Sequence, residues 1–183
     1  GNDSLSARNG GPNVLFGNDG NDFLGGGDGA DRFFGGAGND NLNGNAGHDA
    51  FDGGLGDDTL YGGAGNDTYT FRRGDGTDTI NNNDSTAGRL DTLVLDGLNA
   101  ADIRLEQQWN YYDLAFVVKA SGESIKVQNF FSYDYYKLDA VKFADGTSWN
   151  RATLLAQEVS LLGGAGNDSL SARNGGPNVL FGN

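Results

Sequence analysis

Residues 17–70 consist of six consecutive nine-residue units that share one pattern. In order, the units read GNDGNDFLG, GGDGADRFF, GGAGNDNLN, GNAGHDAFD, GGLGDDTLY and GGAGNDTYT. Glycine fills the first and fourth positions of every unit, and aspartate fills every sixth position. The eighth position is always large and apolar: Leu24, Phe33, Leu42, Phe51, Leu60 and Tyr69. So strict a period, with the apolar residue in phase, points to a solenoid of stacked short units.

Each unit combines a tight loop with a short strand. Glycine permits positive φ, so the backbone can turn sharply and direct its carbonyl oxygens toward one centre. The last three residues of a unit form a strand with one inward apolar side chain. Loop and strand then alternate in a flattened spiral with two units per turn. We therefore predict an all-β fold, a parallel β-roll (a β-helix or solenoid), in which the loops of alternate units stack.

The sixth-position aspartates predict two columns of stacked carboxylates: Asp22, Asp31, Asp40, Asp49, Asp58 and Asp67. Carboxylate and carbonyl oxygens are the ligands that Ca²⁺ prefers. The strand spacing would place successive carboxylates about 4.8 Å apart. At that distance two unit charges repel by about 3 kcal/mol at an effective dielectric of about 20. We therefore expect Ca²⁺ between successive loops, and folding that depends on the metal.

The pattern continues, less regularly, on both sides of the six units. Asp3 stands at the sixth position of a partial unit, and residues 8–16 fit with Asn13 at that position, where we expect a weaker site. Downstream, residues 73–80 place Asp78 at the sixth position. These loops form columns of five and four, which predicts about seven Ca²⁺ sites if every gap is filled.

The charge distribution supports ligation. Residues 1–88 contain 14 Asp, no Glu and 4 Arg, a net charge of −10, whereas the remainder carries −3 of the total −13. Using only the short carboxylate suits tight loops around an ion. Composition alone would also permit a disordered Gly- and Asp-rich linker, but the strict period argues against it. The negative charge and scattered Arg disfavour nucleic acid as a partner.

The first 18 residues, GNDSLSARNGGPNVLFGN, recur without change at 166–183, an offset of 165 residues. The second copy lies within a regular unit, residues 163–171, whose sixth residue is Asp168. We expect the chain to be one period of a tandem array, with neighbouring copies as end-to-end partners. The alternative is an isolated terminal or engineered duplication. The sequence has no apolar run long enough for a transmembrane segment.

Between the roll and the second copy, glycine becomes scarce and alternating apolar patterns take over. Strands are expected at 91–95, 103–106, 114–119, 124–127 and 141–143, with turns at Ser121–Gly122 and Asp145–Gly146. Asn150 is expected to cap a short helix over residues 151–159. We assign residues 1–80 to the roll, 81–160 to a small β-rich unit that caps it or links it to the next, and 161–183 to the start of the next roll.

The nonapeptides of residues 1–80 and 163–183 resemble those of the RTX (repeats-in-toxin) proteins, the haemolysin-type calcium-binding family. DTLVLDG at 91–97, KVQNFF at 126–131 and VKFADGTSW at 141–149 resemble the related domain of the same family. The resemblance implies a parallel β-roll, type I secretion by a Gram-negative bacterium, and calcium-driven folding outside the cell.

The resemblance also implies ligands. It assigns that role to the sixth-position aspartates, Asp3, Asp78 and Asp168 included. It implies backbone carbonyl ligation by Gly27, Gly29, Gly36, Gly38, Gly54, Gly56, Gly63 and Gly65. The third-position Asp19 and Asp28 are candidate additional ligands, and Asn13 and Asn45 depart from the family pattern.

An enzymatic function receives little support. His48, the one histidine, stands at a variable fifth position where we expect an exposed side chain. The sequence has no cysteine and no HExxH, P-loop or EF-hand pattern. We expect a non-enzymatic, extracellular calcium-binding structural module, repeated in a long adhesin-like or fibre-forming bacterial protein. The alternative is the carrier region of a type I-secreted toxin or hydrolase whose activity lies outside this chain.

Aromatic residues gather at 109–112 and 130–136. They form either a contact surface for a cell-surface, glycan or fibre partner, or the core and rim of the small β unit. We favour the second interpretation.

Overall fold

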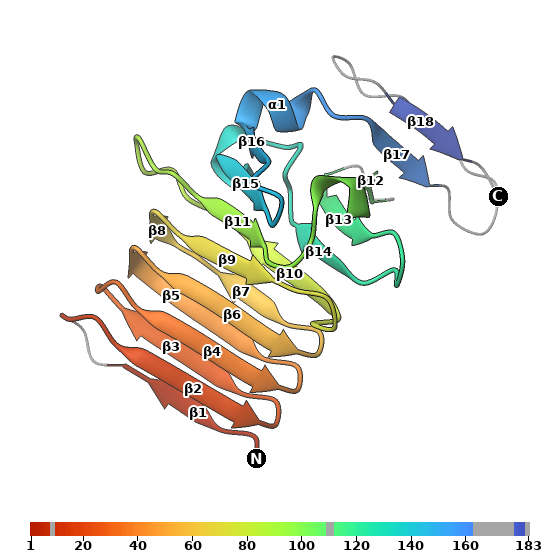
Figure 1. The fold of residues 1–183 in the computed structure, drawn as a ribbon. Coiled ribbons are helices and arrows are strands. Elements are labelled where there is room, and N and C mark those ends of the chain that lie inside the picture. Colours follow the sequence, from red (N-terminus) through yellow and green to blue (C-terminus); the bar gives the residue numbers. More distant parts are fainter. Residues whose placement is uncertain (8–9, 109–111, 163–177, 182–183) are drawn as a thin grey trace.

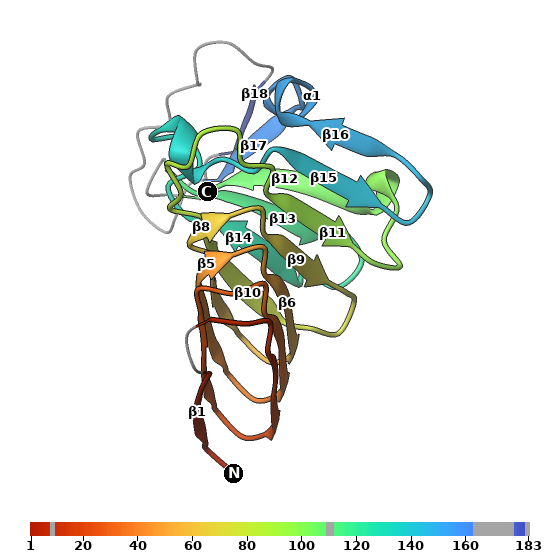
Figure 2. The ribbon, with the colours of Figure 1, turned by 90° about the vertical axis from the view of Figure 1, so that its left-hand side faces the viewer.

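The computed structural model describes residues 1–7, 10–108, 112–162 and 178–181. Within them, two β-sheets face each other across a thin apolar core, and a wider cap covers one end of the narrow roll (Figures 1 and 2). The first sheet has eleven strands and the second has seven. The predicted all-β roll is confirmed.

In the roll, successive strands alternate between the two sheets, and each pairs in parallel with the strand one full turn later. The roll strands of the first sheet are β1 (Ser4–Ser6), β3 (Phe23–Gly27), β5 (Asn41–Gly47), β7 (Thr59–Tyr61) and β10 (Thr77–Asn81), with β8 (Ala64–Gly65) beside β5. Those of the second sheet are β2 (Val14–Asp19), β4 (Arg32–Ala37), β6 (Ala50–Leu55) and β9 (Thr68–Phe71).

The eighth-position residues build the core of the roll. The register stacks Leu24 on Leu42 in the first sheet and Phe33 on Phe51 in the second. The Phe33 and Phe51 rings are parallel, with centroids 4.9 Å apart, and Tyr69 continues the stack. These side chains are fully buried or nearly so, which confirms the predicted inward position. These stacked rings hold β4, β6 and β9 of the second sheet in register.

The cap extends both sheets and the same core. In the first sheet, β10 is followed by β14 (Ser124–Val127), β13 (Leu114–Val118), β12 (Ile103–Gln107), β17 (Val159–Leu162) and β18 (Asn178–Phe181). In the second, β9 is followed by β11 (Thr92–Leu95), β15 (Ala140–Phe143) and β16 (Ser148–Asn150). The 3₁₀ turns η1 (Ala100–Asp102) and η2 (Asp134–Tyr136) and the helix α1 (Arg151–Leu155) complete the cap.

The structure corrects the predicted helix. Asn150 does cap it, because its side chain accepts a 2.8 Å hydrogen bond from the N–H of Thr153. The helix nevertheless ends at Leu155 rather than at residue 159. Val159 instead begins β17, which pairs in parallel with β12. A long-range strand partner thus overrides the local helical pattern, and the sequence contains no local signal for it.

Candidate metal centre

Two ladders of aspartates run along the two sides of the roll, one for each set of stacked loops. The N–H of Asp22 donates to Oδ1 of Asp40 at 2.8 Å, and the N–H of Asp40 donates to Oδ1 of Asp58 at 2.7 Å. Equivalent bonds of 2.6–3.0 Å join each consecutive pair. The first column is Asp3, Asp22, Asp40, Asp58 and Asp78, and the second is Asn13, Asp31, Asp49, Asp67 and Asp91.

The second carboxylate oxygen of these aspartates is the chemically unusual one. In the part of the chain that the structure describes, six Oδ2 atoms are buried and accept no hydrogen bond: those of Asp22, Asp40, Asp49, Asp58, Asp67 and Asp78. A buried carboxylate oxygen without a partner is costly. Cations placed beside these six oxygens, which stand in two regular columns, would remove that cost.

The first glycine of each unit gives these oxygens room. A Cβ added at Gly35 would come closer than 3.0 Å to Oδ2 of Asp40 and to the carbonyl oxygen of Gly53 in the next loop. The same holds for Oδ2 of Asp49 at Gly44 and of the equivalent aspartates at Gly17, Gly53 and Gly62. Carboxylate and carbonyl oxygens thus converge where no side chain fits, and this donor set suits Ca²⁺.

The raised pKa values of several of these carboxyl groups reflect the same cost of burying a charge. Burial raises the pKa of Asp49 to about 6, of Asp58 and Asp67 to about 7, and of Asp78 to about 8. In each case the backbone hydrogen bond opposes the shift, and the carboxylate one turn earlier adds to it. Without a cation, burial and mutual repulsion therefore leave Asp58, Asp67 and Asp78 at least partly protonated at neutral pH.

The backbone at the second and fourth positions mostly adopts the conformation that the loops require. Gly36 and Gly38 have φ of 113° and 127°, and Gly54, Gly56, Gly63 and Gly65 also have positive φ. Asn18 and Asn45 replace glycine at second positions with φ of 70° and 69°, in the left-handed region that asparagine tolerates. The departure at Asn45 therefore does not disturb the backbone.

The loop of Gly27 and Gly29 differs from the others. Neither glycine has positive φ, and the N–H of Gly27 donates to Oδ2 of Asp31 at 2.9 Å. Asp31 is for this reason absent from the set of unpartnered oxygens. No group of three or more Asp, Glu or His side chains converges on one point within the described ranges. Cations in the columns would consequently take many ligands from the backbone.

Comparison with known proteins agrees with this geometry. Residues 1–33, 8–42, 34–69, 43–80 and 160–183 match the RTX calcium-binding nonapeptide repeat (4 copies), and these segments together cover more than half of the chain. The chain belongs to the RTX calcium-binding repeat family. It is thus a calcium-binding repeat module.

Residues 113–153 match the haemolysin-type calcium binding protein related domain, and they include two of the three segments, 126–131 and 141–149, whose sequences resemble that domain. Among solved structures, the solution structure of the AlgE6R3 subunit from the Azotobacter vinelandii mannuronan C5-epimerase is similar, with a TM-score of 0.46 and 22% identity. The alignment covers 91% of this chain and 94% of that subunit. No curated protein matches the chain.

The remaining predicted side-chain ligands of the RTX module are exposed, lie outside the described residues, or are replaced by asparagine. Asp3 donates its N–H to Asp22 at the end of the first column, but its own side chain is exposed. Asp19 and Asp28, at third positions, are also exposed. Asp168 lies outside the described residues. At Asn13 the side-chain amide donates to Oδ1 of Asp31 at 2.8 Å, so a neutral hydrogen bond replaces a charged ligand.

The structure adds two aspartates that sequence reasoning missed. The N–H of Asp67 donates to Asp91, and the N–H of Asp91 donates to Asp139 at 3.1 Å, so the second column continues into the cap. Both residues stand in the sequence pattern D-x-apolar-x, in DTLV and DAVK, without the glycine loop. That shorter pattern is the sequence feature from which the two additional column positions could have been predicted.

Arginines replace cations at this end of the column. The buried guanidinium of Arg89 hydrogen bonds to Oδ2 of Asp91, and it lies 3.0 Å from Oδ2 of Asp139. Arg151 donates to the other oxygen of Asp139 at 2.6 Å. The column of unpartnered oxygens therefore ends at Asp67, and beyond it the protein supplies its own positive charge.

A second, exposed ladder accompanies the first column. The N–H of Asn39 donates to Oδ1 of Asn21 at 2.9 Å, and the N–H of Asp57 donates to Oδ1 of Asn39 at 3.0 Å. In the other set of loops, His48 takes the same role, because its Nδ1 accepts from the N–H of Asn66 at 2.9 Å. His48 is exposed as predicted, and its hydrogen bond is structural.

The aromatic residues of 130–136 divide between core and surface. Phe130 is buried in the core, and Phe131 packs edge-on against it. Tyr133 is exposed and stacks on Tyr135 with ring centroids 5.2 Å apart. Residues 109–111 of the other predicted cluster lie outside the described residues. Neither interpretation of the clusters accounts for all of these positions alone.

Proposed function

We propose that this chain is a structural module whose folding depends on about seven Ca²⁺ ions bound between successive loops of the roll. The observation that carries the proposal is the set of six buried, unpartnered carboxylate oxygens in two regular columns. About seven divalent cations would also offset most of the net charge of −13.

The module works outside the cell in this proposal. RTX repeats are typical of secreted proteins, and no helix among the described residues is long and apolar enough to cross a membrane. Extracellular calcium modules bind with dissociation constants of about 10⁻⁴–10⁻³ M. Sites of that affinity would stay empty during synthesis in the cytosol and would fill after secretion.

Its role is mechanical rather than catalytic in this proposal. The 18-residue identity between residues 1–18 and 166–183 supports a tandem array of copies joined end to end, as in an adhesin or fibre. Each copy would stiffen when calcium fills its columns, so the array would become a rod only outside the cell.

A calcium titration followed by circular dichroism tests the proposal. We expect little β signal in EGTA at neutral pH and a cooperative gain as Ca²⁺ is added. Mg²⁺ at equal concentration is the matched control, because it is smaller and retains its water, and it should not substitute. A full β signal that persists in excess EGTA would overturn the proposal.

A further inference from the structure

The chain carries the same strand sequence at its two ends. Residues 13–16, NVLF, recur as residues 178–181 within the 18-residue identity. Residues 14–16 of the first copy begin β2 at one end of the roll, and the second copy forms β18, the last strand of the first sheet, at the cap end (Figure 1). The same sequence therefore pairs with β4 in the roll and with β17 at the cap end.

At the cap end, β18 pairs in parallel with β17. The register places Ser160 opposite Val179 and Leu161 opposite Leu180. On its other side β17 pairs in parallel with β12, with Val159 opposite Leu105. Thus β17 joins the sheet of this copy to a strand whose sequence is that of the beginning of a roll.

At the opposite end, the matching edge is bare. The second sheet ends at β2, and no described strand pairs with its outer edge. Next to that edge is a hollow of about 370 Å³, lined by Leu5, Ser6, Ala7, Asn13, Val14 and Leu15. A bare edge beside partly open core residues is a feature that β proteins usually cover.

We propose that residues 159–162 of one copy pair in parallel with the outer edge of β2 in the next copy, in the register that β17 and β18 show. Ser160 then stands beside Val14, Leu161 beside Leu15 and Leu162 beside Phe16. This inference rests on the tandem arrangement under Proposed function. A second copy is the occupant because the same four residues already accept β17 at the cap.

The alternation of side chains agrees with this register. Val14 and Phe16 are 57% and 54% exposed, whereas Leu15 is buried, so the odd-numbered position faces the core. Val159 is buried in its own copy and Ser160 is not. Parallel pairing keeps Ser160 on the outer face with Val14, and Val159 on the core face; a slip by one residue would reverse both.

Disulfide formation between two chains tests the register, because the protein has no cysteine of its own. One protein carries Val14→Cys. The other carries Ser160→Cys together with Val179→Pro and Leu180→Pro, which remove backbone donors from β18 and free β17. The two are mixed with Ca²⁺ in a glutathione buffer, where oxidised glutathione accepts the two electrons. Non-reducing electrophoresis measures the heterodimer.

The matched control replaces Val14→Cys by Phe16→Cys, which is equally exposed on the same strand and face. In the proposed register Ser160 and Val14 have Cα atoms about 4.8 Å apart, within disulfide range, whereas Ser160 and Phe16 are about 8 Å apart and outside it. We expect the Val14→Cys heterodimer to form about tenfold faster, since only that pair satisfies disulfide geometry. Equal rates, or faster reaction at Phe16→Cys, would overturn the register.

Circular dichroism of each variant separates this inference from the calcium proposal. Variants that fold on calcium but form no heterodimer would overturn the joint and leave calcium-driven folding intact. Variants that are folded in EGTA and cross-link at Val14→Cys would support the joint and overturn the calcium dependence. A second measurement needs no proline and uses a single chain. Ser160→Cys with Val179→Cys should form a disulfide, whereas Ser160→Cys with Phe181→Cys should not. The reverse result would contradict the proposal.

Discussion

In the six ladder aspartates whose Oδ2 is unpartnered, the two carboxylate oxygens differ in role. In Asp40, Oδ1 accepts the N–H of Asp22, whereas Oδ2 is buried without a partner. Asparagine can perform the first function but carries no charge for the second. Asn13, the first residue of the second column, likewise carries no charge, and its amide donates to Asp31. If the columns bind Ca²⁺ as proposed, an Asp-to-Asn change should therefore separate ion binding from hydrogen bonding.

Asp58→Asn tests this separation. The substitution keeps an oxygen that can accept the N–H of Asp40, but it removes a ligand charge. We expect the calcium concentration at half-folding to rise about tenfold, because ligand charge sets affinity in such sites. Asp57→Asn is the matched control, as Asp57 is adjacent but exposed, and it should change the midpoint by less than about twofold. Equal effects in a circular dichroism titration would contradict the assignment.

The raised pKa values predict how pH acts on the ion-free chain. For Asp58, Asp67 and Asp78 the folded pKa is about 7 to 8, above the ordinary value of 3.8. A raised carboxyl pKa means that the fold gains stability from protonation, fully present below about pH 4 and lost as pH rises to about 8. In EGTA, β structure should therefore increase from pH 8 to pH 5. A decrease over that range would contradict the burial of these groups.

The same titration predicts competition between protons and calcium. Because Ca²⁺ binds the ionised carboxylates, its apparent affinity should fall as pH decreases through the range of about 6 to 8 set by Asp49, Asp58, Asp67 and Asp78. Isothermal calorimetry at pH 8 and pH 6 would measure this. An affinity that is higher at pH 6 would contradict it.

At the scale of the strand, the stability of the roll comes from one apolar side chain per unit. Leu42 is fully buried between the sheets, whereas Leu55, the last residue of β6, is 57% exposed. With calcium present, Leu42→Ala should lower the free energy of unfolding by about 2–5 kcal/mol. Leu55→Ala should change it by less than about 0.5 kcal/mol. Urea unfolding of both variants measures the difference, and similar losses would argue against a common core.

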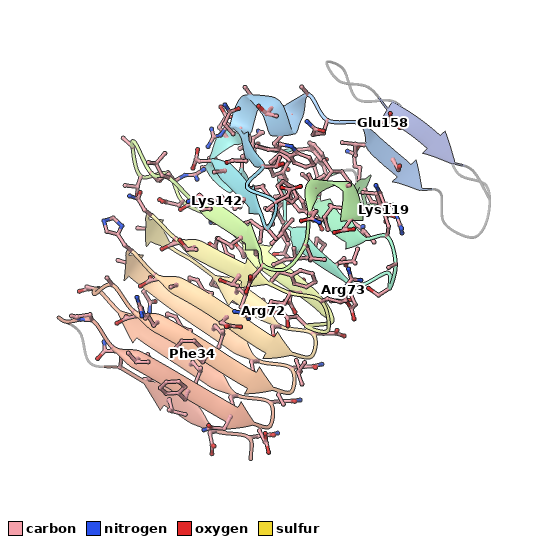
Figure 3. The ribbon with its side chains drawn as sticks, in the orientation of Figure 1. Phe34, Arg72, Arg73, Lys119, Lys142 and Glu158 are labelled. Atoms are coloured by element: carbon pink, nitrogen blue, oxygen red, sulfur yellow. The ribbon has the colours of Figure 1, made fainter. Side chains whose placement is uncertain are left out.

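The arginines near the junction of roll and cap differ in burial. Figure 3 shows Arg72 and Arg73 near the last turn of the roll, and Arg73 is exposed. Arg89, in contrast, is buried among Asp84, Asp91 and Asp139. Arg89→Met should cost about 3–5 kcal/mol even in saturating calcium, because it leaves buried carboxylates unpaired. Arg73→Met is the control, and an equally stable Arg89→Met protein would contradict the counter-charge role.

How much could be predicted differs between the roll and the cap. In the roll, each loop and strand repeats a local pattern, so Asp22 to Asp67 and their apolar partners could be placed from sequence. The cap depends on pairings between distant segments, such as β10 with β14 and β12 with β17. Asp139 joins the second column only because β15 pairs with β11, a contact that no local pattern encodes.

At the scale of the whole molecule, the two sheets form one continuous core from Leu15 in the roll to Val159 in the cap. The cap covers one end of the roll (Figure 2), and at the other end none of the described strands pairs with the outer edge of β2. In the proposed tandem array, β17 of each copy would pair with that edge of the next copy. Rigidity along such an array would depend on the ions in every copy.

Residue-resolved hydrogen exchange of the ladder N–H groups tests the central claim most directly. The N–H groups of Asp22, Asp31, Asp40, Asp49, Asp58 and Asp67 all donate to a carboxylate one turn later. At neutral pH these amides should be protected with calcium and should exchange freely once EGTA removes it. Protection that persists unchanged in excess EGTA would show that the columns close without cations, and the account would then be wrong.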